Sequence, residues 1–336
     1  MKNFLTLCLS FIGALCLTLV TLTAGAQTIR RVNNNGITGT NIYATLQLAH
    51  DAAASGDIIQ VEPSTTAYAA LNITKPLTIV GTGYFLGENA PPALQATAFP
   101  ATIADVTFAA GSTGTVISGL ESNGSFYVRT NTIIIQRCKT AGYIYLGYGG
   151  ATDGAVIRQN YGPGVLQSSI STNSLITNNI FINGQVNLPG ANTGEFNNNT
   201  IINSNVSLNY FNVRNNYFNN ALTTTANTNW SYNLFTIATL PTLGTQSNNT
   251  ASVPVASVFV LAPTAPGQFD AWYKLRTGAN PATGGGQGGI DIGATGSATN
   301  FGYHFAGLPA IPAIYQLNQA VSGNSLNVTL STRSNN

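Results

Sequence analysis

Hydrophobic and polar positions follow a short pattern that returns at a nearly constant interval along the middle of the chain. Each copy has an apolar residue, two variable residues and then an asparagine. The copies are Ile157 to Asn160, Ile176 to Asn179, Phe196 to Asn199, Val213 to Asn216 and Trp230 to Asn233. Two earlier copies, Ile117 to Leu120 and Ile135 to Cys138, end in another residue. The last positions lie about 19 residues apart, which indicates a repeat architecture.

The pattern continues beyond the asparagine. Two positions later the chain has a large apolar residue in Phe181, Ile201, Phe218 and Phe235. Four positions later it has Gly124, Gly142, Gly164, Asn183, Asn203 and Asn220, residues that tolerate tight turns. Leucine-rich repeats need a denser leucine pattern and a helix, and propeller blades need about twice this period. The pattern therefore predicts an all-β fold, a parallel β-helix.

In such a solenoid, equivalent residues of successive turns lie above one another at about 4.8 Å. Apolar positions should form columns in the core, and the asparagines should form a ladder, because buried amides need hydrogen-bond partners. Leu120 and Cys138 stand where this ladder would continue, so we expect both side chains inside.

Residues 1–26 are typical of a secretory signal peptide. Lys2 precedes a mostly apolar run from Phe4 to Val20, and Ala24-Gly25-Ala26 resembles a cleavage site. We therefore expect a secreted or cell-surface protein without a membrane span after cleavage. Cys138 is the one cysteine outside this segment, so no internal disulfide is expected.

Charged residues make up 7% of the chain, and the formal net charge is +2. This composition argues against a nucleic-acid partner, which would need a basic surface. It also leaves few groups for charge-based chemistry.

Residues 43–61 have the pattern of a short helix, a Gly56-Asp57 turn and a first strand. This segment resembles the opening of right-handed parallel β-helix proteins of the pectin-lyase-like superfamily, as found in secreted bacterial members without catalytic activity. Leu46 and Ala49 fall on one helical face. The helix would cover the open end of the solenoid, whose unpaired strand edges otherwise invite aggregation.

Further segments complete the predicted organisation. Residues 71–81 resemble the next coil, and Gly289 to Ala294 resembles a closing strand. We expect loops and imperfect coils over 237–288, and a tail strand over Ser325 to Leu330. In chain order, we expect a signal peptide over 1–26, a cap with a short helix over 27–57, a parallel β-helix over 58–300 and a C-terminal cap or attachment tail over 301–336.

Enzymes of this superfamily act on acidic polysaccharides and need clustered carboxylates or a basic residue near a cation. The ten carboxylates contain no Asp-Asp pair and no Asp-x-Asp. Arg158 and Arg214 share a repeat position but lie three turns apart. Lys139 and Glu121 should be stacked neighbours in a salt bridge. We therefore predict no catalytic residue.

The remaining candidates for chemistry are also weak. His50 and His304 are far apart, and no cysteine cluster accompanies them, so we predict no metal site and no cofactor. The Gly284 to Gly289 run contains a G-x-G-x-x-G match, but it does not follow a strand and open a helix.

The position after each ladder residue should face outward. Its column contains two tyrosines, Tyr161 and Tyr217, which could stack against sugar rings. In the alternative interpretation, a loop or the C-terminal tail covers that face.

These observations predict a structural or adhesive β-helix that binds a glycan or a cell-surface protein, with Tyr161 and Tyr217 as ligand-binding residues. Two alternatives remain open. One is a polysaccharide lyase or hydrolase acting on uronate-type polymers. The other is an extracellular subunit that self-associates through its ends, with the C-terminal strand pairing with another chain.

Overall fold

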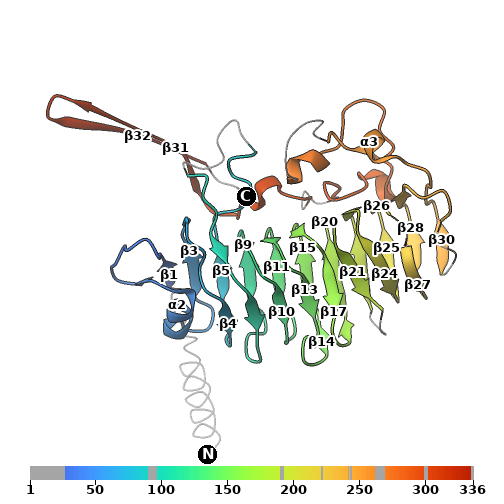
Figure 1. The fold of residues 1–336 in the computed structure, drawn as a ribbon, viewed down its shortest axis with the longest axis horizontal. Helices are drawn as coiled ribbons and strands as arrows, with labels where there is room; N and C mark the ends of the chain where they lie inside the picture. Colours follow the sequence, from blue (N-terminus) through green and yellow to red (C-terminus); the bar gives the residue numbers. More distant parts are fainter. Residues whose placement is uncertain are drawn as a thin grey trace, which may run out of the picture.

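The computed structural model describes residues 27–89, 97–189, 193–220, 222–240, 242, 244–261, 269–298 and 302–333. In these ranges the chain winds into a parallel β-solenoid of about nine turns (Figure 1). The predicted all-β parallel β-helix is thus confirmed. The predicted signal peptide, residues 1–26, lies outside the described residues. None of the helices in the described part is long and apolar enough to span a membrane.

Three parallel sheets, here called A, B and C, form the walls of the solenoid. Sheet A has the strand order β2 (Ile42–Tyr43), β1 (Ile29–Val32), β3 (Ile58–Val61), β5 (Thr78–Val80), β8 (Val116–Ser118), β11 (Ile134–Gln136), β15 (Val156–Arg158), β19 (Ser174–Thr177), β22 (Gly194–Asn197), β25 (Phe211–Arg214), β28 (Asn229–Ser231) and β30 (Thr245–Ser247).

The other two sheets have eight strands each. Sheet B consists of β6 (Thr102–Ile103), β9 (Glu121–Ser122), β12 (Lys139–Thr140), β16 (Tyr161–Gly162), β20 (Ile180–Ile182), β23 (Thr200–Ile202), β26 (Tyr217–Asn219) and β29 (Leu234–Phe235). Sheet C consists of β4 (Leu71–Ile73), β7 (Val106–Phe108), β10 (Phe126–Val128), β13 (Ile144–Leu146), β17 (Val165–Gln167), β21 (Gln185–Leu188), β24 (Asn205–Asn209) and β27 (Leu222–Ala226). A small pair, β14 (Thr152–Asp153) and β18 (Ser171–Thr172), extends two of the turns.

The predicted asparagine ladder is confirmed. Asn199 Oδ1 accepts hydrogen bonds from the backbone N–H of Asn179 at 3.0 Å and from its Nδ2 at 2.9 Å. The same two bonds join each neighbouring pair from Asn160 to Asn233, and Asn249 adds one more rung. Leu120 and Cys138 are fully buried, as predicted. The ladder satisfies amides that burial would otherwise leave without partners.

The residue before each ladder position adopts a left-handed backbone conformation, which the sequence analysis did not identify. Its φ angle is positive at Gly119, Arg137, Gln159, Asn178, Asn198, Asn215, Tyr232 and Asn248. Asparagine tolerates this region better than most residues, so the repeated Asn-Asn pairs carried the signal. This conformation makes the sharp corner between sheets A and B.

The short helix α2 (Leu46–Ala52) lies at the N-terminal end of the solenoid, where the cap was predicted (Figure 1). Thr45 caps it, accepting a hydrogen bond from the Leu48 N–H, and Leu46 and Ala49 are buried. Strand β1 pairs in parallel with β3, so sheet A already begins within the segment predicted as a cap.

After β30 the chain returns along the outside of the solenoid, over sheet B. This covering segment, the described residues within 251–308, contains α3 (Val255–Val258) and the 3-10 turns η1 (Asp270–Tyr273), η2 (Gln287–Gly289) and η3 (Phe305–Gly307). Figure 1 shows its orange and red ribbon above the strands of sheet B. The predicted closing strand at Gly289 to Ala294 is wrong, because Ile292 and Ala294 instead pack against the outer face of sheet B.

The predicted tail strand is present as one half of a hairpin. Strand β32 (Ser325–Arg333) pairs antiparallel with β31 (Ala313–Ser322). The hairpin projects away from the solenoid (Figure 1).

A tyrosine cluster as candidate functional site

Four tyrosines gather on the outer face of sheet C. In β10 and β13, apolar side chains alternate with tyrosine, and the flanking residues Phe126, Val128, Ile144 and Leu146 are buried in the core. Because side chains alternate between the two faces of a strand, Tyr127 and Tyr145 must point outward. The parallel register places these two tyrosines directly beside each other.

The rings form a continuous group. Tyr127 and Tyr145 stack with a centroid distance of 5.2 Å and an interplanar angle of 7°. The Tyr148 ring packs against both, with centroid distances of 4.6 Å to Tyr127 and 5.8 Å to Tyr145. Tyr143 meets the Tyr145 ring edge-on at 6.2 Å. We call Tyr127, Tyr143, Tyr145 and Tyr148 the tyrosine cluster.

The cluster is accessible and carries one basic neighbour. Tyr148 is 36% exposed, and the other three rings are half-buried. The Arg129 guanidinium lies over the Tyr148 ring at 4.9 Å. Arg129 takes part in none of the ion pairs of the described residues. Its positive charge is therefore free to attract a ligand at the edge of the cluster.

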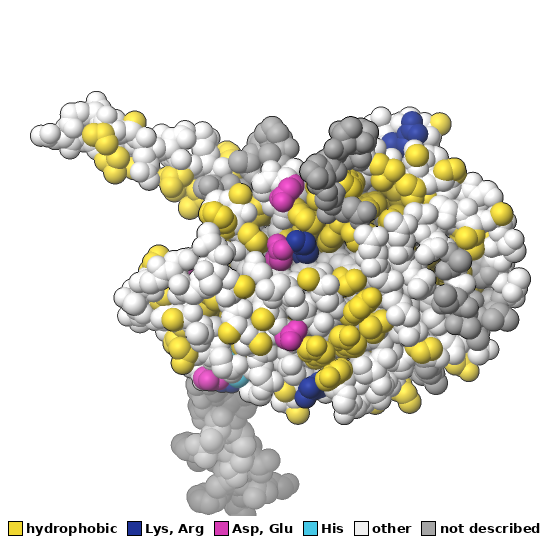
Figure 2. All heavy atoms as spheres, viewed as in Figure 1, with side chains coloured by type: hydrophobic (Ala, Val, Ile, Leu, Met, Phe, Trp, Pro, Cys, Tyr) yellow, Lys and Arg dark blue, Asp and Glu magenta, His cyan; other side chains and the backbone are white. Residues whose placement is uncertain are grey.

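The surroundings of the cluster are mostly polar and weakly charged. Figure 2 shows hydrophobic side chains gathered over β10, β13 and β17, with a basic side chain below them. Leu166 continues the outward column next to Tyr145, and Asn187 follows it. Burial, followed by the neighbouring tyrosines, raises the pKa of Tyr145. Its hydroxyl therefore stays protonated at neutral pH and can donate a hydrogen bond.

The predicted ligand-binding residues Tyr161 and Tyr217 are not accessible. Both stand in the predicted outward column, which the pairing of sheet B confirms. Tyr161 is 5% exposed, and its ring packs against Phe85 at a centroid distance of 5.1 Å, from the loop before β6. Tyr217 is fully buried beneath the covering segment, with the Phe259 ring at 4.9 Å. The Tyr217 hydroxyl donates to the Val253 carbonyl at 3.0 Å. The alternative interpretation of this column, a covered face, is correct.

The other sequence candidates have structural partners. Lys139 Nζ lies 2.6 Å from Glu121 Oε1, as predicted, and 4.6 Å from the centre of the Phe85 ring. His50 is buried, pairs with Asp51 and accepts the Thr74 N–H. Burial raises the pKa of Cys138 to about 12, so the thiol is not a nucleophile in the folded protein.

The two arginines of the predicted repeat position bind separate partners. Arg158 hydrogen-bonds Gln136, whereas Arg214 pairs with Glu195 at 3.0 Å. Among the described residues, no group of three or more His, Cys, Asp or Glu side chains could hold a metal ion.

The sequence analysis missed the tyrosine cluster although its signal was present. Phe126-Tyr127-Val128 and Ile144-Tyr145-Leu146 occur one repeat apart, with tyrosine between two core residues each time. A search for outward positions in the third strand of each turn would have found them. The outward column predicted from the sequence was the one next to the asparagines, on another face of the solenoid.

Comparisons with known proteins give no further guidance. No protein-family model matches the chain, and neither a curated protein nor a solved structure is significantly similar to it.

Proposed function

We propose that the protein is a secreted or surface-displayed β-helix of the pectin-lyase-like type that binds a glycan through the tyrosine cluster and performs no catalysis. The observation that carries this proposal is the contact of four exposed or half-exposed tyrosine rings on a rigid sheet. Aromatic rings present an apolar face with a polar hydroxyl at the tip. A sugar ring, which has apolar C–H faces and hydroxyl edges, matches both properties.

The rigidity of the site favours binding. Tyr127 and Tyr145 belong to strands held by hydrogen bonds on both sides, with buried residues on either flank. Little side-chain freedom is lost when a ligand stacks on rings that already hold one another. The signal-peptide pattern of residues 1–26 supports a site outside the cell, where polysaccharides are abundant.

The test is affinity electrophoresis through gels that contain neutral or acidic polysaccharides, including pectate and alginate. We expect at least one polymer to retard the protein. Tyr127→Ala and Tyr145→Ala should each weaken the binding about tenfold or more, as for aromatic residues at the centre of an interface. Tyr210→Ala is the matched control, because Tyr210 is 47% exposed elsewhere on the solenoid.

Two results would contradict the proposal. One is equal retardation of the wild type and both cluster variants. The other is the appearance of unsaturated or newly reducing sugar ends during incubation with the polymers, which would favour the lyase or hydrolase alternative.

A further inference from the structure

The C-terminal hairpin has one apolar face and one polar face. Cross-strand pairing joins Leu317 to Leu330 and Val321 to Leu326. With Val328 these residues form a mostly apolar face, on which Gln319 opposite Val328 is the polar member. Their exposed fractions reach 78% at Val321 and 61% at Leu326. Asn327 and Thr329 lie on the opposite, polar face by strand alternation. We call the first surface the hairpin's apolar face.

Beyond Leu317, which lines a pocket with Gln60 and Pro63 at the base of the hairpin, this face lacks a partner within the described part of the chain. The hairpin stands free of the solenoid over most of its length (Figure 1), and hydrophobic side chains are visible along its lower side in Figure 2. A two-stranded hairpin alone is marginally stable in water. An exposed apolar surface of this kind marks an interaction site.

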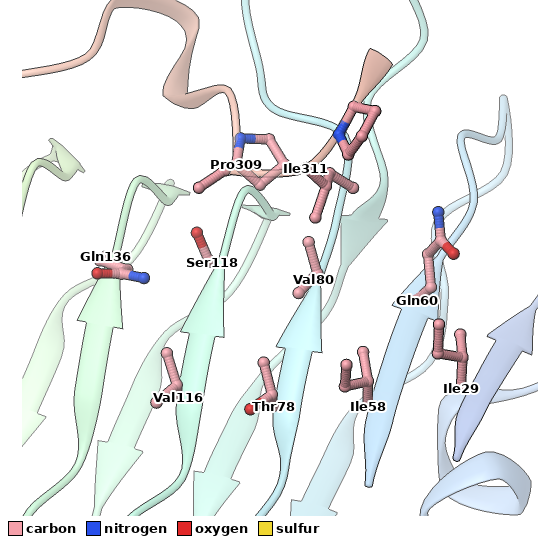
Figure 3. A pocket seen from close by; sticks show the side chains of 12 residues that line it. Ile29, Ile58, Gln60, Thr78, Val80, Val116, Ser118, Gln136, Pro309 and Ile311 are labelled. Carbon is pink, nitrogen blue, oxygen red and sulfur yellow. The ribbon is translucent and has the colours of Figure 1, made fainter. Parts of the chain in front are cut away.

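A groove that also exposes apolar side chains and carries no charge lies on the outer face of sheet A. Figure 3 shows side chains from β1, β3, β5, β8 and β11 beneath the connector from Pro309 to Pro312. The groove encloses about 420 Å³, and its lining contains Ile58, Val80 and Val116 but no charged side chain. The groove-side column continues in register through half-buried Ile134, Val156 and Leu175.

We propose that the occupant of this groove is the hairpin of a second copy of the same chain, so that two copies form a two-fold symmetric dimer. Neither surface carries a charged side chain, and both expose apolar side chains beside a few uncharged polar ones such as Gln60 and Gln136. Contact between them therefore buries apolar area without burying a charge. Each chain carries one hairpin and one groove. In a dimer, each hairpin can therefore dock in the groove of the other copy, which covers both hairpins and both grooves. Such a reciprocal contact gives a closed two-fold assembly.

The dimensions fit this arrangement. Strands of ten and nine residues give a hairpin about 30 Å long and about 10 Å wide. Two reciprocal contacts would bury roughly 1,200 Å² in total, which is at the lower end of stable protein interfaces. The hairpin points away from the groove of its own chain (Figure 1), and Pro309 and Pro312 restrict the backbone of the connector between them.

The first experiment is sedimentation velocity of the purified protein over a range of concentrations. We expect a monomer–dimer equilibrium. Val328→Lys and Val116→Glu should each raise the dimer dissociation constant about a hundredfold, because each buries an unpaired charge. Asn327→Lys is the matched control, since it adds the same charge on the polar face of the same strand, and it should leave the dissociation constant unchanged.

A second variant separates loss of contact from loss of folding. The double variant Val116→Glu/Val328→Lys places opposite charges across both proposed contacts and should recover much of the association. A monomer at every concentration, or a dimer that Val328→Lys does not weaken, would overturn the proposal.

Cysteine cross-linking tests which surfaces meet. Cys138 is fully buried, so introduced thiols can be oxidised selectively. A protein with both Val116→Cys and Val328→Cys should form a covalent dimer, whereas Val328→Cys alone should not. Cross-linking by Val328→Cys alone would show that two hairpins meet face to face. The hairpin would then not bind in the groove of the second copy, and the proposal would be wrong. The outcome is independent of glycan binding, because the tyrosine cluster lies on sheet C.

Discussion

At the residue scale, the asparagine ladder explains why one residue type recurs in a fold with few charges. Each amide bonds the rung before it and the rung after it, and its Nδ2 also reaches a strand carbonyl. For Asn199 these partners are Asn179, Asn216 and the Ile176 carbonyl. A residue that cannot both donate and accept would leave several buried groups without hydrogen bonds.

Replacing Asn199 by alanine should therefore lower the free energy of unfolding by about 2 to 4 kcal/mol, because buried polar groups lose their partners. The measurement is urea denaturation followed by circular dichroism. Asn212→Ala is the control: Asn212 is exposed in β25, although it bonds Glu195 and Asn229 in a surface row. If both substitutions lowered the free energy of unfolding equally, the buried ladder would stabilise the fold no more than the exposed row of side chains does.

At the element scale, the sequence predicted the elements whose pattern repeats and failed where it does not. The columns of Asn179 and Phe181 follow directly from the repeat spacing. The cap helix was predicted from the family resemblance and its apolar face, and the tail strand from its alternating pattern. The resemblance of Gly289 to Ala294 to a closing strand predicted one more strand of the solenoid, but Ile292 and Ala294 are buried against the outside of sheet B. A short apolar segment indicates that its side chains are buried. It does not show which surface covers them.

Buried apolar side chains hold the covering segment on the outer face of sheet B. Ile292 is 1% exposed against sheet B, so Ile292→Asp should release the segment while the solenoid stays folded. We expect rapid proteolysis between residues 251 and 308 with an unchanged β-sheet signal in circular dichroism. Ala279→Asp, at an exposed position of the same segment, should remain resistant. Global unfolding by Ile292→Asp would show instead that the segment and the solenoid fold as one unit.

The candidate site was only partly predictable for a related reason. The sequence placed Tyr161 and Tyr217 correctly in an outward column. The side chains that cover them, such as Phe85 over Tyr161 and Phe259 over Tyr217, are distant in the chain, and no local period reveals them. Tyr127 and Tyr145 were detectable, because their flanking residues share the core periodicity. Their contact with Tyr148, and the contact of Tyr148 with Arg129, depend on a loop conformation that the pattern does not contain.

At the scale of the whole molecule, a buried carboxylate joins the first turns of the solenoid to the covering segment. Asp270 accepts hydrogen bonds from Asn89 Nδ2 at 2.9 Å, from the Tyr303 hydroxyl at 3.1 Å and from the Ala306 N–H at 2.6 Å. Tyr303 in turn contacts the Tyr84 hydroxyl at 2.6 Å. Burial raises the pKa of Asp270, an effect that these hydrogen bonds only partly offset.

The raised pKa gives this contact a defined pH dependence. A carboxyl whose folded-state pKa lies above its unfolded value binds more protons when folded, so its stabilisation is complete below the unfolded pKa and is lost as the pH rises through the folded pKa. Asp270→Asn cannot ionise. We therefore expect the stability of the wild type relative to Asp270→Asn to fall as the pH rises from about 4 towards neutral, given an unfolded pKa near 3.9.

Urea denaturation of both proteins across this pH range measures that difference. Because the other carboxylates are common to both chains, their titration cancels in the comparison. The altered hydrogen bonds of the asparagine shift all values by a constant and leave the slope unaffected. A difference that stays constant with pH would mean that Asp270 titrates alike in the folded and unfolded states. A difference that grows in favour of the wild type would mean that the three donors hold the carboxylate ionised despite its burial.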